Sequence, residues 1–296
     1  MKITSIGEIL YDVYPDGKRL GGAPFNFIYH VWKILGNGNF ISSVGNDENG
    51  NEIINHLTYI GFKTNYIFID GNHPTGTVQV KLLDDKTPKF TISPECSYDY
   101  IELNKRTIEL VENETDLLYF GTLSQRSETT RNSIRTLFHK KIKYFSDLNL
   151  RHDFFSKEMI EEALNVCNVI KINHHELEKI KSHFQLTGDI HSVMEIIVDK
   201  FKLDLLCVTL GSDGAILFNG KTFDKQKSTP AKVIDTVGAG DAYATILSIG
   251  YLKNWDIKKI NRLANQFAAD ICGVEGAVPI NNNIYDKYIR EFNDDS

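Results

Sequence analysis

Short apolar runs alternate along the chain with segments whose apolar residues recur at helical spacing. From Asp116 onward, helix-like segments near 127–138 and 157–166, and then two more helices, separate the apolar runs LLYFG, KYFSDL, NVIKI and LLCVTLG. Buried runs of this length, spaced by helices, are typical of parallel strands joined by right-handed crossovers. The pattern predicts an α/β fold with a doubly wound, mostly parallel sheet flanked by helices.

The first 60 residues predict one strand–helix unit followed by a second. Residues 3–6 are a short buried strand, and the polar, turn-rich stretch to residue 22 is a loop or hairpin. Pro24 suits the first turn of a helix that Gly36 ends, so GGAPFN opens this helix. A second strand, FISSV, and a helix over 52–60 closed by Gly61 come next.

Extended pieces then interrupt the alternation. In residues 77–82, Val78, Val80 and Leu82 share one face, because successive residues of a strand point to opposite sides. A one-faced sheet needs a partner surface. We therefore expect a small β lid, formed by segments near 10–20 and 72–100, over a substrate or at the interface of a homodimer.

Composition narrows the function class. The chain has 296 residues, of which 42% are hydrophobic and 24% charged, and its net charge of −6 offers no basic face for nucleic acid. No run is long enough for a membrane span, and no signal peptide begins the sequence. Its four cysteines are scattered without metal-site spacing. We expect one large domain over residues 1–296, in the cytoplasm, acting on a small molecule.

The segment DTVGAGDAY carries the clearest chemistry. Glycine-rich turns that open a helix direct backbone N–H groups toward one point, so Gly238, Ala239 and Gly240 can form an anion hole. Asp241 follows directly and could take a proton from an attacking hydroxyl while the amides stabilise a transferred phosphoryl group. The alternative is that Asp241 only complements the helix dipole.

Six segments in order along the chain resemble the motifs of the PfkB, or ribokinase-like, carbohydrate kinases. DTVGAGD is similar to the C-terminal signature of that family, GGAPFN to its sugar-binding segment and VGNDENG to a third motif, although Asn49 replaces a common aromatic residue. DLNLR, NHHE and LGSDGA resemble three others. The stretches GEILYD, GGAPFN, PKFTISPECSYDYIEL and GVEGAVP are most similar to bacterial fructokinases.

The resemblance implies an ATP- and Mg²⁺-dependent kinase that converts D-fructose to fructose 6-phosphate, with a ribokinase-like fold and its site between sheet and lid. Asp241 would be the catalytic base, with the anion hole at Gly238, Ala239 and Gly240. Glu176 would contact Mg²⁺ through water. The resemblance leaves open whether the protein also binds a monovalent cation such as K⁺. The resemblance assigns Asp12, Gly22, Asn26 and Arg151 to the sugar, and Asn173, Thr209, Gly211, Ser212, Gly214 and Asn265 to the nucleotide.

Simpler interpretations exist for several of these residues. Asn173 and Glu176 could be a helix cap with an acidic first turn, and Arg151 could form a surface ion pair. Two alternative functions also stay open: a kinase for another sugar, such as 2-keto-3-deoxygluconate or ribose, and a sugar-binding regulator that has lost phosphotransfer.

Overall fold

The computed structural model describes residues 1–82, 88–138, 141–229, 231–279 and 282–294. Its strands are β1 (Ile3–Ile6), β2 (Leu10–Tyr14), β3 (Gly17–Gly21), β4 (Asn39–Gly45), β5 (Ile67–Asp70), β6 (Gly76–Leu82), β7 (Pro88–Ile92), β8 (Leu117–Phe120), β9 (Lys143–Asp147), β10 (Val169–Asn173), β11 (Leu205–Thr209), β12 (Ala215–Phe218) and β13 (Phe223–Gln226). Its helices are α1 (Ala23–Leu35), α2 (Glu48–Tyr59), α3 (Lys105–Glu114), α4 (Glu128–Thr136), α5 (Lys157–Val166), α6 (His174–Phe184), α7 (Ile190–Phe201), α8 (Ala239–Leu252), α9 (Ile257–Cys272) and α10 (Asp286–Asp294).

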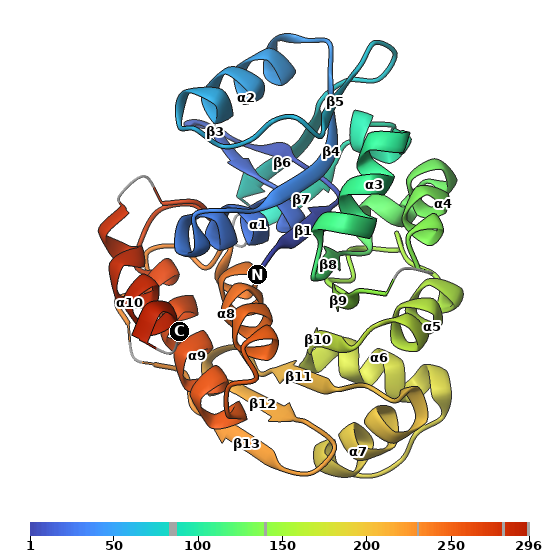
Figure 1. The fold of residues 1–296 in the computed structure, drawn as a ribbon, viewed down its shortest axis with the longest axis vertical. Coiled ribbons are helices and arrows are strands. Elements are labelled where there is room, and N and C mark those ends of the chain that lie inside the picture. Colours follow the sequence, from blue (N-terminus) through green and yellow to red (C-terminus); the bar gives the residue numbers. More distant parts are fainter. Residues whose placement is uncertain (83–87, 139–140, 230, 280–281, 295–296) are drawn as a thin grey trace.

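The main sheet confirms the predicted α/β architecture. Within the described ranges it has nine strands in the order β13-β12-β11-β10-β9-β8-β1-β4-β5 (Figure 1). Neighbours from β11 to β5 are parallel, whereas β12 pairs antiparallel with both β11 and β13. The carboxyl ends of the parallel strands therefore meet along one edge, where open α/β sheets bind ligands.

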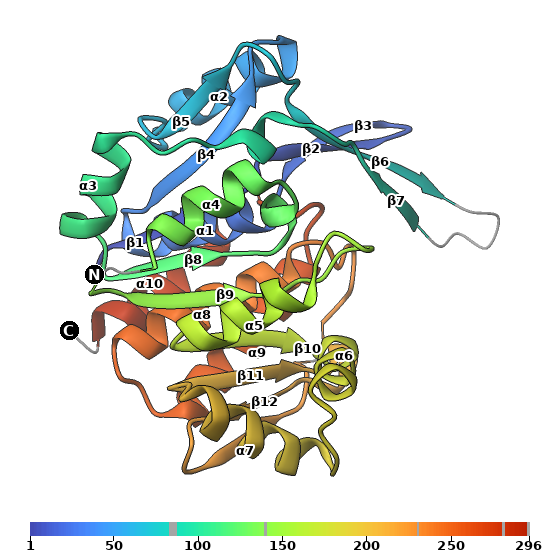
Figure 2. The same ribbon diagram turned by 90° about the vertical axis from the view of Figure 1, so that its right-hand side faces the viewer.

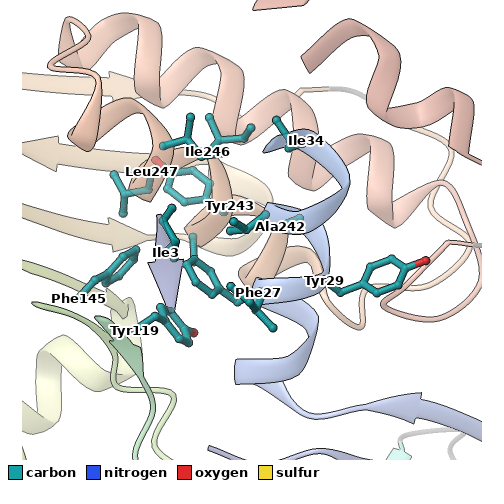
Figure 3. Packing of buried hydrophobic residues seen from close by; sticks show 14 of the residues in the cluster. Ile3, Phe27, Tyr29, Ile34, Tyr119, Phe145, Ala242, Tyr243, Ile246 and Leu247 are labelled. Carbon is teal, nitrogen blue, oxygen red and sulfur yellow. The ribbon is translucent and has the colours of Figure 1, made fainter. Parts of the chain in front are cut away.

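Helices cover both faces of this sheet, and each face has its own apolar core. The first core joins α1, α2, α8, α9 and α10 to one face, and the second joins α3 to α7 to the other. Phe27 of α1 stacks on Tyr119 of β8 in the first core, with ring centroids 3.8 Å apart (Figure 3). This packing fixes α1 over the centre of the sheet.

A four-stranded sheet in the order β3-β2-β6-β7 forms the predicted lid. Figure 2 shows it projecting from the body of the molecule at the carboxyl-end edge of the main sheet. Val78 and Val80 of β6 are buried and Gln79 between them is exposed, as the alternation predicts. The side chain of Leu82 lies outside the described residues. Because Val78 belongs to the second core, part of the apolar lid face packs on the chain itself.

Three elements differ from the sequence-based expectation. Helix α2 begins at Glu48, four residues earlier than predicted, because the Asp47 side chain caps it by accepting a hydrogen bond from the Gly50 amide. Helix α3 was not predicted, and β5 falls among the extended pieces expected after α2 but had no predicted bounds. No helix within the described ranges combines the length and the apolar composition that crossing a bilayer requires.

Candidate active site

Polar side chains follow the carboxyl ends of adjacent parallel strands and form a row along one edge of the sheet. Glu8 comes two residues after β1, and Asp147 ends β9. Asp147 lies in register with Lys171 of β10, and Asn173 at the end of β10 lies in register with Thr209 of β11. The edge therefore brings together residues that are distant in sequence. Its β1 end holds residues that the motif resemblance assigns to the sugar, and we call it the sugar side. Its β11 end holds residues assigned to the nucleotide, and we call it the nucleotide side.

Asp241 and Asn26 meet where the N-termini of α8 and α1 approach this edge. The Asn26 Nδ2 group donates a 2.8 Å hydrogen bond to Asp241 Oδ2. Asp241 is 8% exposed, and burial raises the pKa of its carboxyl to about 7, although the hydrogen bond from Asn26 opposes that shift. A fixed carboxyl that titrates near neutral pH suits a general base.

The glycine-rich turn before Asp241 has the geometry of an anion hole. Gly238 is the N-cap of α8 and has φ +80°, a left-handed conformation that favours glycine. A Cβ there would lie 2.5 Å from Ala277 Cβ, so space also excludes a side chain. Asp235 fixes the turn by accepting hydrogen bonds from the amides of Val237 at 3.0 Å and Gly276 at 3.1 Å. The Ala239 amide makes one long hydrogen bond, of 3.4 Å, to the Thr236 carbonyl oxygen. Backbone amides at a helix N-terminus attract negative charge.

A buried ion pair between Lys171 and Asp147 lies next to this turn. Lys171 Nζ donates to Asp147 Oδ2 at 2.6 Å, and both side chains are less than a tenth exposed. Burial opposes the charged form of Lys171, but Asp147 outweighs it and raises the pKa of the ammonium. A Cβ on Gly240 would lie 3.4 Å from Lys171 Nζ, so the positive charge sits against the anion hole. Sequence reasoning missed this residue, although a lysine inside the apolar strand NVIKI was a signal for it.

On the sugar side, Asp12 projects from the lid strand β2. It is half-buried, and burial raises its pKa to about 6, opposed chiefly by the Arg151 guanidinium. The same guanidinium lowers the pKa of Asp241. Arg151 is exposed, and its guanidinium has no ion-pair partner among the residues that the structure describes. Gly22, the N-cap of α1, packs on the backbone of Glu8, where a Cβ would lie 2.5 Å from the carbonyl oxygen.

Glu8 is a second buried carboxyl that sequence reasoning did not single out. It is 2% exposed, and burial raises its pKa to about 7. The charge of Asp241 contributes to this shift, whereas Arg151 and Arg126 oppose it. The hydrophobic pattern does not predict a functional role for Glu8, which stands alone in the apolar segment over residues 6–10. Its position in the site follows only from the fold.

The nucleotide-side residues form a tight turn between β11 and β12. Gly211 has φ +61°, and Gly214 has φ +92° with no room for a Cβ, which would lie 1.9 Å from the Gln226 oxygen. Leu210 N donates to Gly214 O at 2.8 Å and closes the turn. Ser212 at its tip is exposed, and Thr209 before it is half-buried. The turn thus presents backbone and small polar groups at the edge of the sheet.

Asn265 lies on α9, in a buried polar chain beside this turn. Asn261 Nδ2 donates to the Ala215 and Asp224 carbonyl oxygens, so its Oδ1 must accept, and it does so from Tyr243 at 2.6 Å and from Asn265 Nδ2 at 2.8 Å. The Asn265 amide nitrogen is therefore used within the protein, which leaves its oxygen as the group available to a ligand.

Asn173 and Glu176 form a reciprocal capping box at the start of α6. Asn173 Oδ1 accepts from Glu176 N at 2.9 Å, and Glu176 Oε2 accepts from Asn173 N at 2.8 Å. Glu176 Oε1 also accepts from Leu150 N at 2.7 Å. The capping interpretation is thus correct for both residues, as an addition to any role in binding.

These residues fit a hydrated magnesium ion. Each Glu176 oxygen keeps a second lone pair besides the one that accepts a backbone N–H. No three His, Cys, Asp or Glu side chains gather into a direct metal site in the part of the chain that the structure describes. Mg²⁺ commonly keeps several waters and contacts one or two carboxylates together with substrate phosphates.

A doubly wound sheet with a β lid, an anion hole at a helix N-terminus and a buried carboxyl beside it define a phosphotransferase-type α/β protein. The pfkB family carbohydrate kinase model matches residues 2–283. The chain therefore belongs to that family, as its motifs predict.

Several relatives named as sugar kinases match over most of the chain. An uncharacterized sugar kinase from Pyrococcus horikoshii is 30% identical over 291 residues, covering 90% of this chain and 88% of its own. Its ATP complex has a TM-score of 0.82 at 25% identity, covering 98% of this chain and 99% of its own. A fructokinase of Salmonella typhimurium is 27% identical over 256 residues, 82% of this chain and 81% of its own. A Vibrio cholerae fructokinase with bound fructose, ADP and potassium shares the fold, with a TM-score of 0.80 at 21% identity and coverage of 98% and 97%.

Proposed function

We propose that this sugar kinase transfers the γ-phosphoryl group of ATP to the C6 hydroxyl of D-fructose. The observation that carries the proposal is the position of Asp241, which is buried beside the anion hole of Gly238, Ala239 and Gly240 and held by Asn26. A carboxyl with a pKa of about 7 can accept the proton of an attacking hydroxyl near neutral pH. Its raised pKa and fixed orientation go beyond what complementing the helix dipole requires.

The chain's own groups divide the reaction between them. Asn26 holds the Asp241 carboxyl in place through its hydrogen bond to Oδ2, and Asp241 removes the proton of the acceptor hydroxyl. The amides at the start of α8 stabilise the charge of the transferred phosphoryl group, and Lys171 adds positive charge behind Gly240. The lid carries Asp12 to the sugar side, where closing would exclude water as a competing acceptor.

ATP would lie along the β11 side of the edge. Thr209, Gly211, Ser212 and Gly214 line its phosphates and ribose, because small residues permit close backbone approach. Asn265 presents its oxygen to the base, and Asn173 holds the start of α6 in place. Mg²⁺, held through water near Glu176, would neutralise charge on the phosphates. Whether K⁺ also binds stays a prediction, and so does a homodimer through the lid.

Fructose is favoured over other acceptors by hydrogen-bonding chemistry. Asp12, Gly22 and Asn26 offer carboxylate and amide contacts that suit the hydroxyls of a neutral sugar. A sugar acid such as 2-keto-3-deoxygluconate would need a cationic clamp, and Arg151 is the one guanidinium on this side whose charge no described partner balances. Phe25 of α1 is fully buried in the first apolar core.

A sugar-binding regulator without catalysis is the alternative from another class. Burying the Asp241 carboxyl at the anion hole costs free energy of folding. A regulator without catalysis would gain nothing from that cost, whereas a kinase uses the carboxyl as a base. The complete set of Asp241, Asn26 and the glycine turn therefore supports an active kinase.

The test is a coupled assay of ADP formation with fructose, ribose, glucose and 2-keto-3-deoxygluconate. We expect kcat/KM for fructose to exceed the others by at least about tenfold, which corresponds to roughly 1.4 kcal/mol of transition-state binding. Preference for another sugar would reject fructose and keep the kinase. Absence of sugar-dependent ADP formation with every acceptor would support the regulator.

A further inference from the structure

Several buried side-chain atoms at the sugar side have no hydrogen-bond partner. Glu8 Oε2, Tyr98 OH, Ser124 Oγ and Arg126 Nη1 are all shielded and have no hydrogen-bond partner among the residues that the structure describes, and Asn26 Oδ1 is a fifth such atom. Leaving a buried polar atom unpaired costs about 1–3 kcal/mol. Isolated cases occur in proteins, but a group of them around one carboxyl indicates a ligand that completes the hydrogen bonds.

These atoms lie in the same region of the site as Glu8, at the edge of the sheet. A Cβ on Gly7 would lie 3.2 Å from Ser124 Oγ, which places Ser124 beside the strand end that carries Glu8. Burial raises the pKa of Tyr98, and the charges of Arg126 and Glu8 also act on that phenol. The charges of Asp241 and Arg126 both act on Glu8. The group is therefore continuous with the site that contains Asp241.

Arg126 is held rigidly and is already neutralised. Its Nε and Nη2 groups donate to the two oxygens of Asp99 at 2.8 and 2.7 Å, and Nη2 also donates to the Ser93 carbonyl at 2.7 Å. Arg126 and Asp99 are both nearly inaccessible. Its remaining donor, Nη1, thus suits a neutral oxygen better than an anion.

The available atoms match the chemistry of a polyol. Glu8 Oε2 and Asn26 Oδ1 accept hydrogen bonds, Arg126 Nη1 donates, and the hydroxyls of Tyr98 and Ser124 can do either. Sugar hydroxyls supply both functions. A carboxylate or phosphate supplies acceptors only and would be repelled by Glu8.

Building on the sugar kinase proposed above, we infer that Glu8 binds a hydroxyl of the acceptor sugar and determines specificity for a neutral, polyhydroxylated substrate. Tyr98, Ser124 and Arg126 complete the same wall of the site. Together with Asp12, Glu8 would give the sugar one carboxylate from the body and one from the lid.

The first test removes hydroxyl groups that the folded protein does not use. We expect Ser124→Ala to leave the melting temperature unchanged or higher, because Ser124 Oγ has no partner among the described residues. Tyr98→Phe should change it little, because the phenol has only the weak Cys96 thiol beside it. KM for the sugar should rise about tenfold in each, while KM for ATP stays within about twofold. Loss of thermal stability with unchanged sugar KM would mean that these hydroxyls are structural, and would overturn the inference.

The second test assigns Glu8 itself with deoxy analogues of the preferred sugar. Wild-type enzyme should lose at least about tenfold in kcat/KM for the analogue that lacks the hydroxyl bound by Glu8. In Glu8→Gln that penalty should shrink to within about threefold, and penalties for the other analogues should persist. Glu114→Gln is the matched control, because Glu114 is exposed and pairs with Lys2 away from the site.

The outcomes separate the two proposals. If wild-type enzyme phosphorylates sugars but Glu8→Gln keeps every analogue penalty, Glu8 does not bind the substrate and only this inference fails. If wild-type enzyme phosphorylates no sugar, the proposed function fails and the inference fails with it.

Discussion

Asn26 and Asp241 are 215 residues apart in the sequence and are joined by a 2.8 Å hydrogen bond between buried side chains. Asn26 lies in the first turn of α1 and Asp241 in the first turn of α8, so the bond connects the segment assigned to the sugar with the anion hole. The Thr245 hydroxyl of α8 lies between the two helices, 2.9 Å from the Asp241 carbonyl oxygen and 3.3 Å from the Phe27 carbonyl oxygen of α1. The two helix starts thus behave as one unit.

The pKa of Asp241 predicts how the rate depends on pH. Catalysis needs the carboxylate, and burial raises its pKa to about 7, so kcat/KM should rise about tenfold per pH unit below 7 and level off above it. The pH profile between 5 and 9 measures this. The residual rate of Asp241→Asn is the control. Its pH profile reports the titration of the nucleotide and of the other site residues without Asp241. A profile already flat at pH 5 would exclude a base with this pKa.

Gly238→Ala should damage both the anion hole and the fold. The new Cβ would meet a left-handed backbone and the Ala277 side chain at 2.5 Å, so we expect at least a tenfold loss of kcat/KM and a loss of stability above about 1 kcal/mol. Gly36→Ala is the control: Gly36 has φ +69° but no atom within 4 Å of a Cβ. Gly36→Ala therefore strains the backbone in the same way but brings no steric clash, and the activity of this variant should stay near wild type. Equal effects of the two substitutions would contradict the close-packed turn.

Lys171→Met should destabilise the protein by about 3–5 kcal/mol, because it leaves Asp147 buried without its partner. The double variant Asp147→Asn with Lys171→Met should recover at least half of that loss, measured by urea unfolding, yet stay impaired in kcat. Lys202→Met breaks an exposed pair with Asp199 and should change stability little. Full recovery of kcat in the double variant would show that the charge of Lys171 is irrelevant to the reaction.

Glu176→Gln should raise the Mg²⁺ concentration needed for half-maximal rate, since a neutral amide attracts the hydrated ion less than a carboxylate does. KM for the sugar should change little. Because the side chain also accepts hydrogen bonds from Asn173 and Leu150, the melting temperature is measured in parallel. An unchanged Mg²⁺ titration together with a lower melting temperature would leave Glu176 as a helix cap alone.

The sequence predicted those parts of the fold that local patterns encode. Pro24 and Gly36 bound α1 because proline suits a first helical turn and glycine a left-handed end. The start of α2 was misplaced because the polar, glycine-containing stretch around Asn49 hides the cap at Asp47. Helix α3 has few apolar residues and gave only a weak periodic signal.

The site was predictable only where a motif carries it. Asp241 and its glycine turn came from such a motif, and so did Asn26. Lys171 gave only one local signal, a lysine within an apolar strand. Glu8 and Arg126 have no local signature, because what sets them apart is burial and a side-chain atom without a partner. Those properties arise when strand ends from distant segments meet at one edge.

Testing Asp241 as the general base needs an Asp241 variant that still folds. The dependence of stability on pH shows whether Asp241→Asn meets this condition. The folded pKa of Asp241, about 7, lies above its unfolded value of about 4, so its contribution to stability is present at low pH and is lost as pH rises through 7. Asparagine has no charge to bury. Asp241→Asn should therefore be at least as stable as wild type at pH 8, and any advantage should shrink toward pH 5.

The most direct measurement is sugar-dependent ADP formation by Asp241→Asn at pH 8 with saturating ATP, Mg²⁺ and the preferred sugar. If Asp241 is the general base at the anion hole, kcat falls by at least about 10²-fold while the protein stays folded and nucleotide affinity is retained. A kcat within about threefold of wild type in the folded variant would contradict the account, because the buried carboxyl would then have no part in transferring the phosphoryl group.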